Sequence, residues 1–69
     1  MNKFKERLNE LLQESDKNQT YIAKQINISR QTLTNYKSGY SEPNIDLLIK
    51  IADYFNVCID YLVGRQDWF

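Results

Sequence analysis

Apolar residues recur at helical spacing in five separate stretches of the chain, and polar residues fill the positions between them. Apolar side chains three or four positions apart lie on one face of a helix. This pattern predicts helices over residues 3–14, 19–26, 30–37, 45–56 and 59–63. The period-two alternation of strands is absent, so we expect an all-α fold, a compact bundle of five short helices.

Each predicted helix places its apolar residues on the side that would face a shared core. In chain order these residues are Phe4, Leu8, Leu11 and Leu12; Ile22, Ala23 and Ile26; Leu33 and Tyr36; Leu47, Leu48, Ile51, Ala52 and Phe55; Ile59 and Leu62. The charged positions of the first helix, Arg7 among them, are expected to face solvent. A chain of 69 residues is the size of one small domain, spanning residues 1–69.

The two central helices are joined by a very short connection. Asn18 and Ser29 are suitable N-caps for them, because a short polar side chain can accept a hydrogen bond from the first turn. Asn27 stands where the chain must reverse, and asparagine tolerates a left-handed backbone. Ala23 is small enough to let the helices cross closely. This is the pattern of a helix-turn-helix over residues 19–38, whose second helix would enter the major groove of DNA.

The ends of the remaining helices are also marked in the sequence. Gly39 and Gly64 can take the positive φ that follows a helix, and Asn44 can cap the helix that begins at Ile45. Cys58 occupies the N-cap position of the last helix. We weigh two interpretations of Cys58, a redox-sensing thiol and a small core thiol near a helix start, and favour the second.

The formal net charge is zero, which at first argues against a nucleic-acid partner. The distribution of the charges along the chain argues in the opposite direction. Residues 17–41 contain four cations, Lys17, Lys24, Arg30 and Lys37, and no carboxylate, whereas the two flanks together carry a net charge of −4. Local charge decides whether phosphates are attracted, because salt limits the range of the field to about 10 Å.

The composition excludes several other functions. The chain has no histidine and a single cysteine, so an intrachain disulfide, the usual zinc sites and histidine-based catalysis are not expected. No apolar run is long enough to cross a membrane, and the N-terminus lacks the pattern of a signal peptide. We therefore expect a cytoplasmic, nucleoid-associated protein that is not an enzyme and has no cofactor, no metal and no small-molecule ligand.

From residue 8 to residue 62 the chain resembles the Cro/CI-type helix-turn-helix regulators, also called the XRE or lambda-repressor-like family. The resemblance lies in QTYIAKQINISRQTLTNYKSG, the Pro43–Asn44 helix start, LLIKIADYFNV and IDYLVG. It implies a lambda-repressor-like DNA-binding fold. The base-reading positions that it implies are Arg30, Gln31, Thr34 and Asn35. The phosphate-contacting positions are Asn18, Gln19, Thr32, Tyr36, Lys37 and Tyr40.

The chemistry of these side chains suits that role. Arginine can pair bidentately with guanine, glutamine and asparagine with adenine, and the threonine methyl can contact thymine. The alternative is that they are ordinary solvated residues of a surface helix. Tyr40 could donate to a phosphate or pack on the helix over residues 45–56. Where many relatives pair Arg with Glu, this chain has Leu12 and Lys37, which frees Lys37 to reach phosphate; Glu42 stands where a basic residue often occurs.

One such module carries few cations, so we expect a homodimer that binds a pseudo-palindromic operator on double-stranded DNA. The candidate interface, proposed from the last helix and the tail over residues 65–69, is Ile59, Leu62, Trp68 and Phe69. Alternatively the tail folds back onto the helix over residues 3–14 or 45–56 of its own chain. The expected function is transcriptional regulation, and we favour repression over activation. Two alternatives remain. One is an antitoxin or restriction-modification controller that regulates its own operon, and the other is a protein-interaction module without DNA binding.

Overall fold

Five α-helices form the regular structure of the chain, in a computed structural model that describes residues 2–69. Their bounds are Phe4–Glu14 (α1), Gln19–Ile26 (α2), Arg30–Ser38 (α3), Ile45–Phe55 (α4) and Ile59–Val63 (α5). No strand occurs within the described range, and the predicted all-α bundle of five short helices is confirmed. Met1, the first residue of the predicted domain, lies outside that range.

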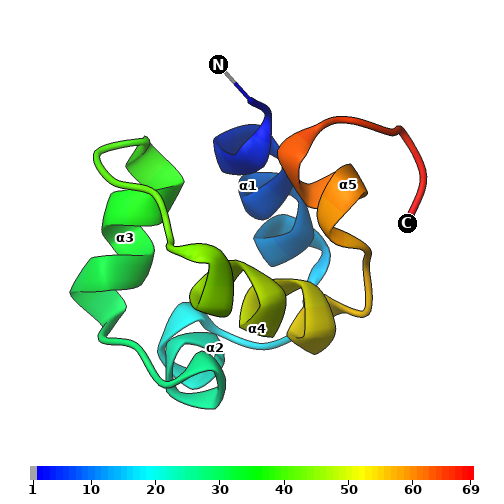
Figure 1. Ribbon diagram of the computed structural model, residues 1–69. Helices are drawn as coiled ribbons and strands as arrows, with labels where there is room; N and C mark the ends of the chain where they lie inside the picture. The colour runs from blue at the N-terminus through cyan, green and yellow to red at the C-terminus, as the bar shows by residue number, and fades with distance from the viewer. Residues whose placement is uncertain (1) are drawn as a thin grey trace.

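α4 crosses the lower half of the molecule in Figure 1, between α2 and α5. The first helix, α1, contacts both α3 and α5, and α4 contacts α2 and α5. The helix-turn-helix pair α2 and α3 therefore packs against α1 and α4, while α5 and the tail lie beside α1. This arrangement leaves one side of α3 without a helix against it.

The core draws its side chains from all five helices. Its largest fully buried members are Leu8, Ile22, Ile26, Leu33, Ile51 and Leu62. Fully burying a side chain of this size contributes roughly 1.5–3 kcal/mol relative to leaving it in water. Four residues predicted for the core, Leu12, Leu47, Phe55 and Ile59, are only partly buried and pack against its edge.

Side-chain caps begin three of the helices as the sequence predicted. The Oδ1 of Asn18 accepts from the backbone N–H of Tyr21 at 2.8 Å. The Oγ of Ser29 accepts from Thr32 N–H at 3.0 Å, and the Oδ1 of Asn44 accepts from the first turn of α4 at 2.9 Å. Each such cap contributes about 1 kcal/mol, because it satisfies an N–H that the helix cannot.

The residues with a left-handed backbone conformation confirm the predicted turns. One further residue of this kind was not predicted from the sequence. Asn27 has φ 67° and ends α2, and Gly39 and Gly64 have φ 82° and 90°. Asn56 was predicted to lie inside the fourth helix. It instead takes φ 57° and ends α4 after Phe55, where its N–H bonds back to Asp53 O at 3.2 Å. Asparagine supplied the helix stop that glycine more often supplies.

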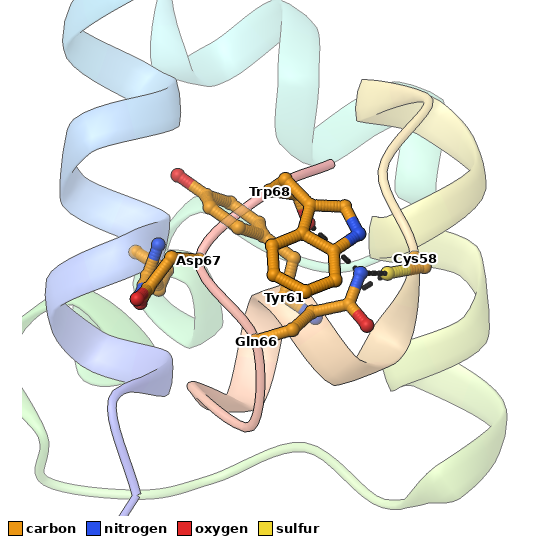
Figure 2. A network of polar contacts seen from close by, with 6 residues as sticks. Cys58, Tyr61, Gln66, Asp67 and Trp68 are labelled. Carbon is orange, nitrogen blue, oxygen red and sulfur yellow. Dashed lines mark hydrogen bonds and ion pairs between the residues drawn. The ribbon is translucent and has the colours of Figure 1, made fainter.

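The C-terminal tail folds back onto its own chain, against α5 and α1. The rings of Phe69 and Tyr61 meet edge to face with centroids 4.8 Å apart, and the N–H of Cys58 donates to Phe69 O at 3.1 Å. Figure 2 shows Gln66 directed at Cys58, whose Sγ lies 2.9 Å from the amide nitrogen. The alternative given for the tail was that it folds in cis onto the first or fourth helix, and here it packs on the first and the fifth.

Arg7 on α1 holds the tail from the other side. It was predicted to face solvent, but only 11% of its side chain is exposed. Its guanidinium lies 4.3 Å from the centre of the Tyr61 ring and bonds Asp67 Oδ1 at 3.1 Å. The hydrogen bond with Tyr61 and, after it, the bond with Asp67 raise the pKa of Arg7. The periodicity of α1 could not predict this contact, because Asp67 lies sixty residues further along the chain.

Candidate nucleic-acid interface

A tight backbone turn sets the angle between α2 and α3. The N–H of Ile28 donates to Ala23 O at 2.9 Å, and the left-handed Asn27 redirects the chain between them. Ser29 then caps α3. Ala23 and Leu33 are both buried, and α2 and α3 pack against each other, so the core fixes the position of α3 relative to α2. A rigid helix is what the presentation of a fixed set of side chains requires.

The outward face of α3 brings together the four side chains predicted to read bases. Arg30, Gln31 and Thr34 are exposed and Asn35 is half-exposed, whereas Leu33 is buried on the opposite side. The placement of these side chains on one open helix face agrees with the prediction. All four carry hydrogen-bonding groups, and no other helix covers them.

Two of these side chains are bonded to each other. The Nε2 of Gln31 donates to Oδ1 of Asn35 at 3.0 Å, one helical turn further along α3. Such pairs at i, i+4 stabilise an exposed helix by roughly 0.2–0.5 kcal/mol. The bond was not foreseen from the sequence, where the two amides were treated as independent.

The side chains predicted to contact phosphates lie in different environments. Asn18, at the start of α2, is exposed, with its Oδ1 committed to the cap. Gln19 beside it is half-exposed, and the hydroxyl of Thr32 is 2.8 Å from Ser29 Oγ. Lys37 is half-exposed at the last turn of α3.

The two tyrosines of this predicted set behave in opposite ways. Tyr40 is 82% exposed, so the alternative that it packs on α4 is wrong. Tyr36 is only 5% exposed, and its ring meets Phe4 edge to face at 6.2 Å. Burial raises the pKa of Tyr36. The ring of Tyr36 is thus held in the core, so only its hydroxyl could reach a phosphate, and the contact predicted for Tyr36 stays a prediction.

A cleft of about 310 Å³ opens between α1, α2 and α3 beside this surface. It is lined by Asn9, Leu12, Gln13, Gln19 and Lys37. Asn9 was missing from the predicted site. Its Nδ2 donates to Lys37 O at 3.0 Å and to Lys5 O at 2.8 Å, which ties α1 to the end of α3. Nothing in the local pattern of α1 marked Asn9, because its partner lies on another helix.

The segment that contains α2 and α3, residues 17–41, carries cations and no carboxylate. The four cations of residues 17–41 form no ion pair within the part of the chain that the structure describes, where Arg7 and Asp67 make the single recorded pair. Lys17 remains exposed, with its ammonium 5.5 Å from the centre of the Tyr21 ring. Unpaired cations around a polar helix face are suited to attract an anionic polymer.

Of the residues predicted to form the dimer interface, some are exposed in this fold and one is buried in the core. Trp68 and Phe69 are 70% and 64% exposed although the tail is held in cis, and Ile59 is half-buried. Leu62 is fully buried among the core side chains. Its proposed place in an intermolecular contact is wrong for this fold, because a partner could reach it only if the core opened.

Other kinds of site were also sought in residues 2–69. No helix there is both long and apolar enough to cross a bilayer. No cluster of three or more metal-ligating side chains was found in the same range. The single cysteine, Cys58, is partly buried and accepts from Tyr61 N–H at 3.4 Å, so its thiol takes the place of an N-cap oxygen.

Comparison with known proteins supports the interpretation of α2 and α3 as a helix-turn-helix. A helix-turn-helix family model matches residues 8–62. The HTH-type transcriptional regulator ImmR of Bacillus subtilis is 36% identical over 61 residues, covering 88% of this chain and 48% of ImmR. The cryptic phage CTXphi transcriptional repressor RstR of Vibrio cholerae is 40% identical over 63 residues, covering 91% of this chain and 56% of RstR. The chain thus spans about half the length of these curated relatives.

A solved structure extends the likeness to three dimensions. A crystal structure of a transcriptional regulator from Listeria innocua superposes with a TM-score of 0.86 at 38% identity. The match covers 93% of this chain and 60% of that one. The relatives named here are described as transcriptional regulators. The family match, the shared fold and the motif over α2 and α3 agree, and the chain belongs to the Cro/CI-type (XRE) helix-turn-helix family.

Proposed function

We propose that this chain is a sequence-specific double-stranded DNA-binding transcriptional regulator that places α3 in the major groove. One observation carries the proposal. The face of α3 that bears Arg30, Gln31 and Thr34 is open and polar, and the two cations of this helix, Arg30 and Lys37, form no recorded ion pair. A major groove about 12 Å wide accommodates a helix and displays a distinct hydrogen-bonding pattern for each base pair.

The proposed contacts follow from the chemistry of each group. Arg30 would pair bidentately with guanine O6 and N7, and the Thr34 methyl would contact thymine. Gln31 and Asn35 supply amide groups in the same region of the groove. Each good pair contributes about 1–3 kcal/mol of discrimination against the wrong base. Asn18, Gln19, Thr32, Lys37 and Tyr40 would position the helix by contacting the phosphates and so carry no sequence preference.

We further propose that the protein acts as a homodimer on a pseudo-palindromic operator, as a repressor that occupies a promoter. The four cations of residues 17–41 give one subunit little affinity for phosphates on its own. Two subunits would double this contribution and place two recognition helices about 34 Å apart, one turn of the duplex. The exposed pair Trp68 and Phe69, together with Ile59, is the proposed contact surface.

The net charge of zero and the acidic Glu42 in the loop after α3 favour a second candidate, a protein-interaction module without DNA binding. An antitoxin or restriction-modification controller that represses its own operon would use the same DNA contacts as the first candidate. Its test is a comparison of transcription from its own promoter with and without the protein.

The decisive experiment is in vitro selection from random duplexes, followed by binding measurements over a range of salt concentrations. We expect a pseudo-palindromic motif to be enriched. If a dimer engages three or four cations per subunit, the logarithm of the affinity should fall with a slope of about −5 to −7 against the logarithm of salt concentration. Selection that enriches no motif, with no salt-dependent binding to any duplex, would favour the interaction module.

A further inference from the structure

A lysine of α1 lies against the end of α3. Gly39, which ends α3 with φ 82°, has the side chain of Lys5 directly beside it. A Cβ placed on Gly39 would be 3.1 Å from Cδ of Lys5 and 3.9 Å from its Nζ. In Figure 1 the first turn of α1 and the end of α3 lie at the same end of the molecule. The ammonium of Lys5 therefore lies beside the start of the loop that leads to Tyr40.

The backbone of α1 is also fixed to that end of α3. The Nδ2 of Asn9 donates to the carbonyl oxygens of both Lys5 and Lys37, at 2.8 Å and 3.0 Å. One amide nitrogen thus holds the two lysine backbones near each other, although they belong to helices far apart in the sequence. Lys5 is exposed, and it takes part in no ion pair recorded within residues 2–69. Its charge is therefore free to act on a ligand outside the chain.

The fold separates Lys5 from Lys3, which the sequence gives no reason to distinguish. Both are cations at the start of the first helix. The side chain of Lys3 lies against Gly64 instead, where an added Cβ would be 2.7 Å from the Cβ of Lys3. The N–H of Lys3 donates to Val63 O at 3.0 Å. Lys3 therefore belongs to the end of α5, and Lys5 belongs to the end of α3.

We propose that Lys5 is part of the DNA-binding surface and contacts a backbone phosphate at the end of α3, beside Lys37. This inference rests on the function proposed above. The last carbonyl groups of a helix carry a partial negative charge, which would repel a phosphate at this end of α3. Cations from two helices offset that charge, and each one that displaces counterions from the duplex adds to the affinity. Such a contact positions the protein and carries no sequence preference.

The test compares Lys5→Gln with the parent and with Lys3→Gln, the matched control, which removes the same charge at the start of the same helix. Binding to the preferred duplex and to a duplex of unrelated sequence is measured between about 50 and 200 mM salt. For each Lys5 engaged, Lys5→Gln should reduce the slope of log affinity against log salt by about 0.9, on both duplexes alike. The parent's advantage over this variant should then shrink about threefold across that range for each Lys5. Lys3→Gln should keep the parent's slope.

Lys5→Arg, which keeps the positive charge, should also bind with the parent's slope. Because Lys5 is exposed, neither of its substitutions should unfold the chain, and circular dichroism checks this. An equal slope for Lys5→Gln and the parent, with salt-dependent binding by both, would overturn the assignment of Lys5 alone. An equal reduction in Lys3→Gln would overturn it too, because the effect would then come from total charge. A parent that binds no duplex would overturn the proposed function and the Lys5 contact together.

Discussion

Single residues of α3 divide between two tasks, according to the side of the helix on which they lie. Leu33 and Tyr36 anchor the helix in the core, and Arg30, Gln31 and Thr34 face outward. Helical periodicity separates these two groups because they alternate about every half turn. Tyr36 shows the limit of family resemblance, since it matched a position near the DNA backbone and yet its ring lies in the core.

Arg30→Ala should weaken binding to the preferred duplex by about 1–3 kcal/mol and relax the preference at one base pair. The reason is that a bidentate contact to guanine is lost without any change in the core. Fluorescence anisotropy with the preferred site and its single-base variants measures both effects. Lys37→Ala is the matched control. It should weaken all sequences alike and reduce the salt slope by about one unit. An Arg30→Ala chain with the parent's sequence preference would exclude Arg30 as a base-reading residue.

Tyr36→Phe should make the protein less sensitive to alkaline pH. Burial raises the pKa of Tyr36 in the folded chain above its ordinary value of about 10. The stability that comes from keeping this tyrosine protonated is therefore complete below pH 10 and is lost as the pH rises through the folded pKa. The phenylalanine variant should lose less stability above pH 10, by at most about 1.4 kcal/mol per pH unit.

Urea unfolding of the parent and the Tyr36→Phe variant between pH 8 and about pH 11.5 measures the difference. Tyr40→Phe, which removes the hydroxyl of an exposed ring, is the control and should follow the parent. Parallel stability curves for Tyr36→Phe and the parent over this range would show that ionisation of Tyr36 does not govern alkaline unfolding.

At the scale of the elements, the helix ends carry much of the information that positions α3. Asn18 and Ser29 cap α2 and α3, and Asn27 supplies the left-handed residue between them. These features depend on a few neighbouring residues, so they could be recognised in the sequence. The end of α4 differed only because Asn56 can either continue a helix or leave it in the left-handed conformation, and the residues after it decide which.

Asn27→Ala should reduce the free energy of unfolding by about 1–2 kcal/mol, because alanine is strained at φ 67°. Asn27→Gly should stay close to the parent, since glycine adopts this conformation without strain. Chemical denaturation of the three chains provides the comparison. Asn56→Ala, at φ 57° and outside the helix-turn-helix, is a second site at which a similar loss is expected. Equal stability of the Ala and Gly variants at Asn27 would argue against backbone strain as the cause.

At the scale of the whole molecule, α5 and the tail lie on the side of α1 away from α3, as Figure 1 shows. Arg7, Tyr61, Asp67 and Phe69 come from three separated segments and meet only in the folded chain. The contact holds the tail in cis and still leaves Trp68 mostly exposed (Figure 2). A tail fixed in this way offers a preformed aromatic surface to a second subunit, and such surfaces often mark protein contacts.

Trp68→Ser should therefore shift the protein from dimer to monomer without unfolding it, since the indole is 70% exposed. Size-exclusion chromatography with light scattering over a range of concentrations measures the change. Ile49→Ser, which removes an exposed apolar residue from α4, is the matched control and should leave the dimer intact. If Ile49→Ser dissociates the dimer and Trp68→Ser does not, the interface lies on α4 and not on the tail.

The sequence by itself determined the five helices, most of their ends and the outward face of α3. These depend on hydrophobic periodicity and on caps, which act over a few residues. The tertiary structure alone decided the burial of Arg7, the bond from Asn9 to Lys37 and the cis placement of the tail. It also decided which partner the Gln31 amide takes. In these cases the outcome depends on side-chain direction or on distant segments, neither of which a linear pattern contains.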